Sequence, residues 1–169
     1  MKALCVIDVQ NAMVMGSNPV YRSHEVLSNI KELIQKAREK SIPVIYVQHN
    51  EDNSDFQKGL KSWEIVDLIK PLKEDVIIHK TFSDSFKETN LKQVLDKQEI
   101  NELIIVGMQT DYCVNATSLR AHELNYDVTV VSDAHSTFDD EKSAKEIIDD
   151  YQKEWIKHFK CKKTSEIRF

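Results

Sequence analysis

The sequence predicts an α/β domain in which helices cover both faces of a largely parallel β-sheet. Short apolar runs rich in β-branched residues alternate along the chain with longer amphipathic stretches. The apolar runs are continuous, which is typical of strands that are buried on both faces. The 169 residues are enough for one such domain with a substantial core.

The expected strands stand out by composition and length. The strong ones are residues 2–9 (KALCVIDV), 42–49 (IPVIYVQH), 103–108 (LIIVGM) and 128–134 (VTVVSDA), and a weaker one is 75–80 (DVIIHK). Helical periodicity fills the intervals over residues 23–41, 88–101, 115–127 and 141–159. This alternation specifies a doubly wound fold. Ser23 is the expected cap of the first long helix, and residues 50–71 form a long irregular connection of the kind that is often functional.

Composition excludes several classes of partner and compartment. The formal net charge of −5 argues against nucleic acid or an anionic membrane as the main partner, and the basic residues 157–169 are expected to be a solvated terminus. No apolar run reaches membrane-spanning length, and the segment MKALCVIDVQ meets an aspartate too early for the core of a signal peptide. The three cysteines lack metal-binding spacing, so we expect a cytoplasmic protein with reduced thiols, Cys5 lying in the core and Cys161 being incidental.

Chemically reactive residues follow the ends of different predicted strands. Asp8, Lys80 and Cys113 all lie at or just beyond carboxyl ends, where open parallel sheets bind their ligands. A thiol at a helix start and near a lysine has a lowered pKa, which makes it a nucleophile. The Asp8 carboxylate can take the proton from the thiol and later give it to the leaving group. Alone, each has an ordinary explanation: Asp8 as a cap or ion-pair partner, Lys80 as a surface charge, and Cys113 as a buried filler.

Several motifs in uninterrupted order resemble the isochorismatase-like cysteine hydrolases, a family that includes the nicotinamidases. The motifs are VIDVQNAM, VIYVQHNED, HKTFSDSFKETNL and GMQTDYCVNATSLRAHELNYDVTVVSDAHSTF, and the match runs from about Lys2 to Asp139. The resemblance implies a Rossmann-like, three-layer α/β/α fold with a six-stranded, mostly parallel sheet, formed by residues 1–169 as a single domain.

The resemblance also implies roles for individual residues. Cys113 would be the nucleophile, Asp8 the general base and acid, and Lys80 the charge that holds both in place. A cis peptide is expected before the cysteine, at Met108–Gln109. The backbone N–H groups of Gln109 and Cys113 would form an oxyanion hole.

The region after the second strand departs from the nicotinamidase pattern. Nicotinamidases carry an Asp-x-His pair and further histidines there, which bind a metal ion. In residues 48–63 of this chain His49 is the only histidine, and Asp52 and Asp55 have a different spacing. Catalytic zinc normally has three protein ligands. We therefore expect no metal and no cofactor, as in a metal-free branch of the family, and nicotinamide is a poor candidate substrate.

Residues in the loops are the candidates for the substrate pocket. By loop position they are Met13, Trp63, Phe86 and Tyr112. Trp63 serves equally well as a loop anchor, and Phe86 as a core plug. His135 lies on the rim, where contact with a ligand is one interpretation and a turn or cap role is the favoured one. Gln10 and Asn11 are interpreted as residues that orient Asp8 and the end of its strand.

The leading hypothesis is hydrolysis of a C–N amide bond of a small molecule through a thioester on Cys113. An alternative is vinyl-ether hydrolysis of isochorismate, which needs an acid at Asp8 but no thiol. That substrate is a dicarboxylate, for which Lys80 and Arg22 are the only evident cations. A second alternative is a non-catalytic binding module. We expect a small-molecule substrate and a homo-oligomer.

Overall fold

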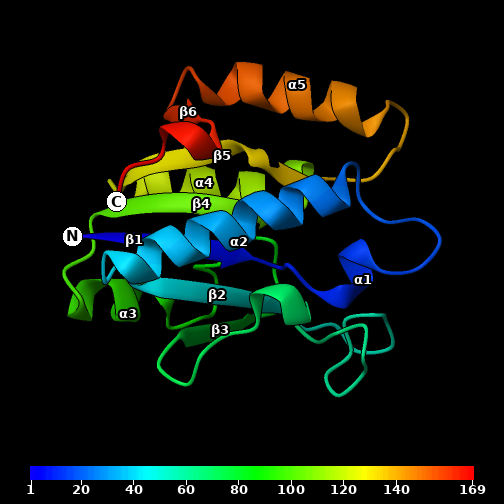
Figure 1. Ribbon diagram of the computed structural model, residues 1–169, viewed down its shortest axis with the longest axis horizontal. Helices are drawn as coiled ribbons and strands as arrows, with labels where there is room; N and C mark the ends of the chain where they lie inside the picture. Colours follow the sequence, from blue (N-terminus) through cyan, green and yellow to red (C-terminus); the bar gives the residue numbers. More distant parts are fainter.

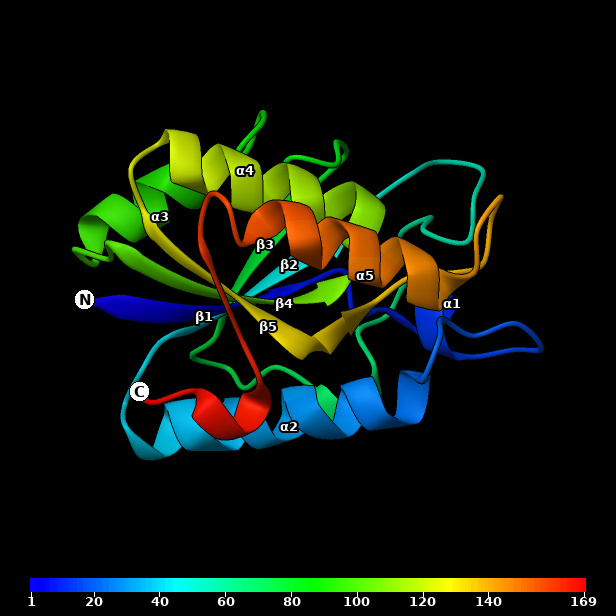
Figure 2. The ribbon, with the colours of Figure 1, turned by 90° about the horizontal axis from the view of Figure 1, so that it is seen from above.

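The computed structural model, which describes residues 1–169, is built on a six-stranded sheet of order β3-β2-β1-β4-β5-β6 (Figures 1 and 2). Every neighbouring pair of strands is parallel. The strands are β1 (Lys2–Ile7), β2 (Val44–His49), β3 (Val76–Lys80), β4 (Glu102–Met108), β5 (Asp127–Ser136) and β6 (Lys160–Lys162). The predicted three-layer α/β/α fold is confirmed.

Helices cover both faces of the sheet. They are α1 (Asn11–Val14), α2 (Ser23–Glu39), α3 (Leu91–Lys97), α4 (Asn115–Glu123) and α5 (Ala144–Trp155), with short turns η1 (Asp67–Ile69), η2 (Thr110–Val114) and η3 (Thr164–Glu166). Figure 2 shows α2 on one face, and α3, α4 and α5 on the other. None of the helices combines the length and apolar character needed to span a lipid bilayer.

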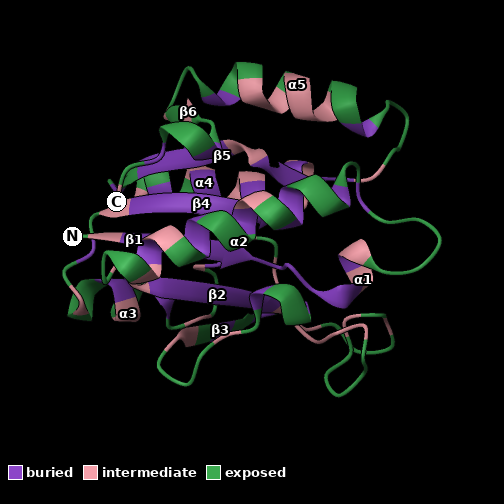
Figure 3. Cartoon of the chain, in the orientation of Figure 1, coloured by how far each residue is buried: buried purple, intermediate pink, exposed green.

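The strands divide the core into two apolar layers, because successive side chains point to opposite faces. In β1, Leu4 and Val6 pack on the α2 side, whereas Cys5 and Ile7 pack on the side of α3, α4 and α5. The central strands β1 and β4 are therefore buried at every position after their first residue (Figure 3). Cys5 is a core residue, as predicted.

The start of α2 differs from the prediction. Arg22, not Ser23, occupies the capping position, with a positive φ of 51° and no side-chain capping bond. Ser23 is already inside the helix and buried. The Arg22 guanidinium instead pairs with Glu25 in the first turn. Because no side chain caps this helix, the sequence carries no capping residue that would mark its start.

The basic terminus is part of the fold, although its lysines are exposed to solvent as predicted. Residues Lys160–Lys162 form the edge strand β6 beside β5, with Cys161 opposite Val130. The backbone N–H and hydroxyl of Thr164 then donate to Asp133 Oδ1 at 2.8 and 2.7 Å. Ile167 is buried in the α2 layer. Lys160 and Lys162 are exposed on either side of Cys161. Because the segment is dominated by charged residues, its sequence does not read as a strand.

Gly107 allows β4 to approach β1 where both strands end. It has a φ of +124°, and a Cβ there would lie 2.0 Å from the carbonyl oxygen of Ile7. Only glycine fits this position. The approach brings the end of β1, and with it Asp8, next to the turn that follows β4.

Candidate active site

The structure brings Asp8, Lys80 and Cys113 together at the carboxyl end of the sheet. The ammonium of Lys80 donates to Asp8 Oδ2 at 2.7 Å and to Cys113 Sγ at 3.3 Å. All three residues are buried, and Cys113 retains the largest exposure, 8%. The three side chains therefore meet at one edge of the sheet, as predicted.

The strands set the direction of these side chains. Lys80 is the last residue of β3 and points to the same face as Ile78, toward the layer that contains Cys113. Its long stem carries the ammonium from edge strand β3 across β2 to the end of β1. Asp8 leaves β1 with a φ of 49°, while its N–H still donates to Val47 of β2.

A wide helical turn holds the thiol. The Met108–Gln109 peptide is cis, as expected from the resemblance. The carbonyl of Gln109 then accepts from the N–H groups of Tyr112 and Val114, at 3.2 and 3.0 Å, on either side of Cys113. The turn begins at Thr110 and continues into α4. Cys113 was expected to open this helix, but the helical backbone starts three residues earlier.

The electrostatics correct the expectation of a lowered thiol pKa. Burial, and then the negative charge of Asp8, raise the pKa of Cys113 to about 12, although the ammonium of Lys80 acts to lower it. Burial also acts to lower the pKa of Lys80, but Asp8 and Cys113 outweigh it and keep that pKa above its ordinary value. The resting site therefore holds a neutral thiol beside a buried carboxylate–ammonium pair.

One polar atom of this cluster has no partner. Asp8 Oδ1 is buried and makes no hydrogen bond, whereas Oδ2 is held by Lys80. Buried carboxylate oxygens are normally satisfied. A free acceptor beside a thiol and an ammonium can receive a proton from a group that reacts there.

His49 belongs to this cluster, although in the sequence it stood out only as a possible metal ligand. Its Nδ1 lies 3.2 Å from the Lys80 ammonium. The Gln10 side chain fixes the His49 backbone, accepting from its N–H at 2.9 Å and donating to its carbonyl at 3.1 Å. Gln10 therefore orients the end of β2, and not Asp8 as predicted. Asn11 likewise does not orient Asp8, because its amide donates to the carbonyl of Lys61. His49 and Lys80 each end a predicted strand, and these strands are parallel neighbours in which the two residues are register partners. Their shared position at the strand ends was the signal that could have placed His49 beside Lys80.

The described side chains do not fit a metal of the nicotinamidase kind. No group of three or more His, Cys, Asp or Glu residues converges on one point. The Nδ1 atom of His49 faces an ammonium.

The four residues predicted to line the substrate pocket lie in different environments. Tyr112 is 54% exposed beside Cys113, and Met13 Sδ is 3.8 Å from the Gln109 amide. Trp63 donates to Asn50 Oδ1 at 2.8 Å and stacks on His79, which points to the face opposite Lys80. It is a loop anchor. The remaining candidate, Phe86, is half-buried; it stacks on Tyr126 and packs against the apolar layer on the side of α3, α4 and α5.

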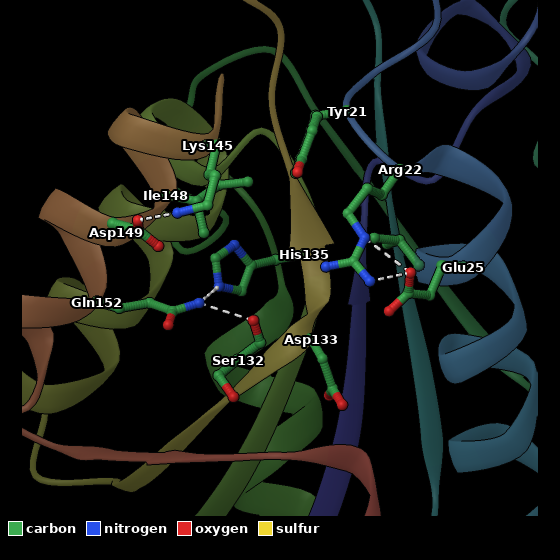
Figure 4. Close-up of a pocket in the computed structure, with 11 residues that line it drawn as sticks. Tyr21, Arg22, Glu25, Ser132, Asp133, His135, Lys145, Ile148, Asp149 and Gln152 are labelled. Atoms are coloured by element: carbon green, nitrogen blue, oxygen red, sulfur yellow. Dashed lines mark hydrogen bonds and ion pairs between the residues drawn. The ribbon is translucent and has the colours of Figure 1, made fainter. Parts of the chain in front are cut away.

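His135 lines a separate cavity between α2, β5 and α5, with a volume of about 160 Å³ (Figure 4). Its Nε2 accepts from the Gln152 amide at 3.0 Å, so the ring proton is on Nδ1 and points to the Thr110 hydroxyl at 2.8 Å. Burial lowers the pKa of His135 to about 4. It is a buried network residue, and not the turn or cap residue predicted. Arg22 also lines this cavity, away from Lys80.

Comparison with known proteins agrees with this geometry. The isochorismatase domain family matches residues 2–156. The chain is 35% identical over 139 residues to the uncharacterized isochorismatase family protein YrdC of Bacillus subtilis, covering 81% of this chain and 74% of that protein. It is 32% identical over 139 residues to a streptothricin hydrolase of Streptomyces noursei, covering 82% of this chain but 50% of that protein.

Solved structures give the same result. A crystal structure of an isochorismatase family protein is 30% identical and superimposes with a TM-score of 0.89, covering 95% of this chain and 96% of the other. An isochorismatase from Pseudomonas putida has the same fold, with a TM-score of 0.92 at 24% identity over 99% of this chain and 90% of that one. The chain belongs to the isochorismatase family.

Proposed function

We propose that this protein hydrolyses a C–N amide bond of a small molecule, with Cys113 as the nucleophile, Asp8 as the proton shuttle and Lys80 as the group that holds both. The observation that carries the proposal is the single ammonium of Lys80 within hydrogen-bonding distance of Asp8 and Cys113. Relatives named streptothricin hydrolase, nicotinamidase 3 (Arabidopsis thaliana) and ureidoacrylate amidohydrolase RutB (Caulobacter segnis) support a hydrolase of this bond class.

The reaction begins with a tetrahedral intermediate on Cys113. The thiol proton of Cys113 passes to the free Oδ1 of Asp8 as sulfur attacks the amide carbon. The raised thiol pKa means that this transfer accompanies attack, because little thiolate exists beforehand. The oxyanion accepts from the N–H groups of Gln109 and Cys113; that of Gln109 donates no hydrogen bond within the chain.

The second half releases the products. Asp8 gives its proton to the departing nitrogen as the C–N bond breaks, leaving a thioester and free ammonia or amine. Asp8 then takes a proton from water, whose oxygen attacks the thioester. The tetrahedral intermediate collapses to the carboxylic acid, and the sulfur of Cys113 regains its proton. Lys80 keeps its ammonium charge throughout and fixes the distance between the two reacting groups.

The enclosure of the site favours a small substrate. Asp8 and Lys80 are buried, so a substrate reaches the cluster over the sulfur of Cys113. Tyr112, exposed beside the thiol, and Met13, next to Gln109, are the proposed walls. We assign Trp63 and Phe86 no contact with substrate, because both are engaged elsewhere.

The test is ammonia release by metal-free protein from a panel of small primary amides that includes nicotinamide. We expect wild type to release ammonia from at least one amide and Cys113→Ala to lose at least about a thousandfold in kcat/KM. Cys161→Ala is the matched control, because this cysteine lies on edge strand β6 and makes no hydrogen bond to the Lys80 cluster, and should retain full activity. An unchanged rate in Cys113→Ala would refute the mechanism.

The same preparations separate the alternative chemistry. Vinyl-ether hydrolysis of isochorismate releases pyruvate, which a coupled assay detects. Pyruvate release that survives Cys113→Ala but not Asp8→Asn would replace amide hydrolysis by acid catalysis at Asp8. Absence of both products would favour a binding role.

A further inference from the structure

The imidazole of His49 lies between the buried ion pair and the outside of the site. Its Nδ1 is 3.2 Å from the Lys80 ammonium, and its Nε2 is 3.9 Å from Glu51 Oε2 on the exposed side. The ring also packs edge-on against Phe56, with centroids 5.4 Å apart. Its side chain is 17% exposed, so it borders the site without being sealed in it.

The chemistry of the pair fixes the direction of the hydrogen bond. A lysine ammonium carries three donors and no acceptor. Nδ1 of His49 must therefore accept, which makes the ring neutral with its proton on Nε2. With Asp8 and Cys113, His49 supplies the third acceptor, so that every N–H of the ammonium has a partner.

We infer that His49 is a positioning residue for the proposed amide hydrolysis: it accepts the third hydrogen bond of Lys80, and thereby aims the other two at Asp8 and Cys113. Without this acceptor the ammonium can rotate about its stem, and one of its donors is left buried and unpaired. Protonation of His49 has the same effect and adds a second positive charge beside Lys80. The inference rests on the proposed function but adds a residue and a pH dependence to it.

The charges around His49 agree with a neutral ring at physiological pH. Burial and then Lys80 lower the pKa of His49, whereas Asp8 and Glu51 act to raise it, and the net direction is downward. These are the charged groups on β3, β1 and the following loop that act on the ring; Phe56 is uncharged. Activity should therefore fall on the acid side as the ring gains its proton.

Two substitutions distinguish the effect of the hydrogen-bond acceptor on His49 from the effect of the bulk of its side chain. In His49→Asn the amide oxygen takes the place of Nδ1 and does not titrate, whereas His49→Leu has similar bulk and no acceptor. We expect His49→Asn to keep kcat/KM within about threefold at pH 7.5 and to lose the acid-side inflection that His49 causes. We expect His49→Leu to lose about tenfold or more at every pH, mostly in kcat. Equal activity of Leu and wild type, equal loss in Asn and Leu, or an unchanged acid limb in Asn would each overturn the inference.

A measurement that needs no substrate separates this inference from the proposed function. Nitrogen-15 NMR of the wild-type imidazole should show the proton of His49 on Nε2, and a pKa of the ring below its ordinary value. A proton on Nδ1, or an ordinary titration, overturns the inference whether or not any amide is hydrolysed. If His49 has the expected tautomer and titration but no amide reacts, only the proposed function fails.

Discussion

Two buried polar networks lie at the carboxyl end of the same sheet, and they differ in charge and in completeness. The network around Lys80 contains a buried ion pair, a thiol and an unpartnered carboxylate oxygen. The network around His135 is neutral, and both ring nitrogens have a partner, Thr110 and Gln152. A satisfied neutral network stabilises a fold, whereas a charged one with a free acceptor retains the capacity to react.

The comparison shows that burial of a histidine or a carboxylate does not by itself mark a functional site. Both networks contain strongly perturbed groups: the pKa of His135 is lowered to about 4, and that of Cys113 is raised to about 12. The difference is the unsatisfied Oδ1 of Asp8, next to a residue that can form a covalent bond.

The largest effect is expected from Lys80→Met. Removing the ammonium leaves Asp8 as an unpaired buried charge, which costs about 3–5 kcal/mol of unfolding free energy. Amide hydrolysis should be abolished. The double variant Lys80→Met with Asp8→Asn should recover most of the stability in urea denaturation but none of the activity. Recovery of activity in the double variant would contradict the assigned role of the pair.

Gly107 stands between the two networks, and Gly107→Ala should be next in size. Its register partners are Ile7 of β1 and His135 of β5. The added Cβ meets the Ile7 carbonyl, and the positive φ is strained for alanine, so we expect a loss of about 3 kcal/mol in unfolding free energy. Gly59→Ala is the matched control, because it also has a positive φ but open space around it, and should lose less. Equal losses in urea denaturation would show that close approach to β1 is unimportant.

His135 should affect stability in a pH-dependent way. Because its folded-state pKa is about 4 against an ordinary value of 6.5, its neutral form is favoured by folding. That stability is present above pH 6.5 and is lost as the pH falls toward 4, with about 2 kcal/mol disappearing between pH 7 and pH 5. His135→Gln should remove this part of the pH dependence, measured as the difference in unfolding free energy from wild type. A constant difference across that range would refute the assignment.

The smallest effect on the fold is expected at the exposed rim. Tyr112→Ala should leave the unfolding free energy within about 0.5 kcal/mol of wild type, because the side chain is 54% exposed. If Tyr112 contacts substrate, KM should rise several-fold in steady-state assays. Tyr21→Ala, another exposed tyrosine beside the His135 cavity, is the control and should leave KM unchanged. A similar KM change in both would remove Tyr112 from the pocket.

The sheet and the convergence of Asp8, Lys80 and Cys113 at one edge of it were predictable because they follow from local patterns. Buried parallel strands read as apolar runs, and the carboxyl ends of such strands share one edge. Asp8 and Lys80 could be placed by that rule alone. Cys113 needed the motif GMQTDYC as well, because the thiol lies beyond the strand in a turn.

The features that escaped prediction depend on long-range contacts. Strand β6 carries lysines at its outward positions, so its pairing with β5 is invisible in the sequence. The side to which Trp63 points depends on the path of the loop after β2. The direction of the Cys113 pKa shift required the balance of burial against Lys80, and a nearby cation alone suggested the opposite sign.

The enclosure of Cys113 has a consequence for resistance to oxidation. Peroxide attacks the thiolate, and susceptibility rises with thiolate content and exposure. A thiol that is 8% exposed, with a pKa near 12, offers an oxidant almost no anion between turnovers. In the proposed mechanism the thiol loses its proton only as the sulfur attacks a bound substrate, so the resting protein should tolerate peroxide without a reductase to repair it.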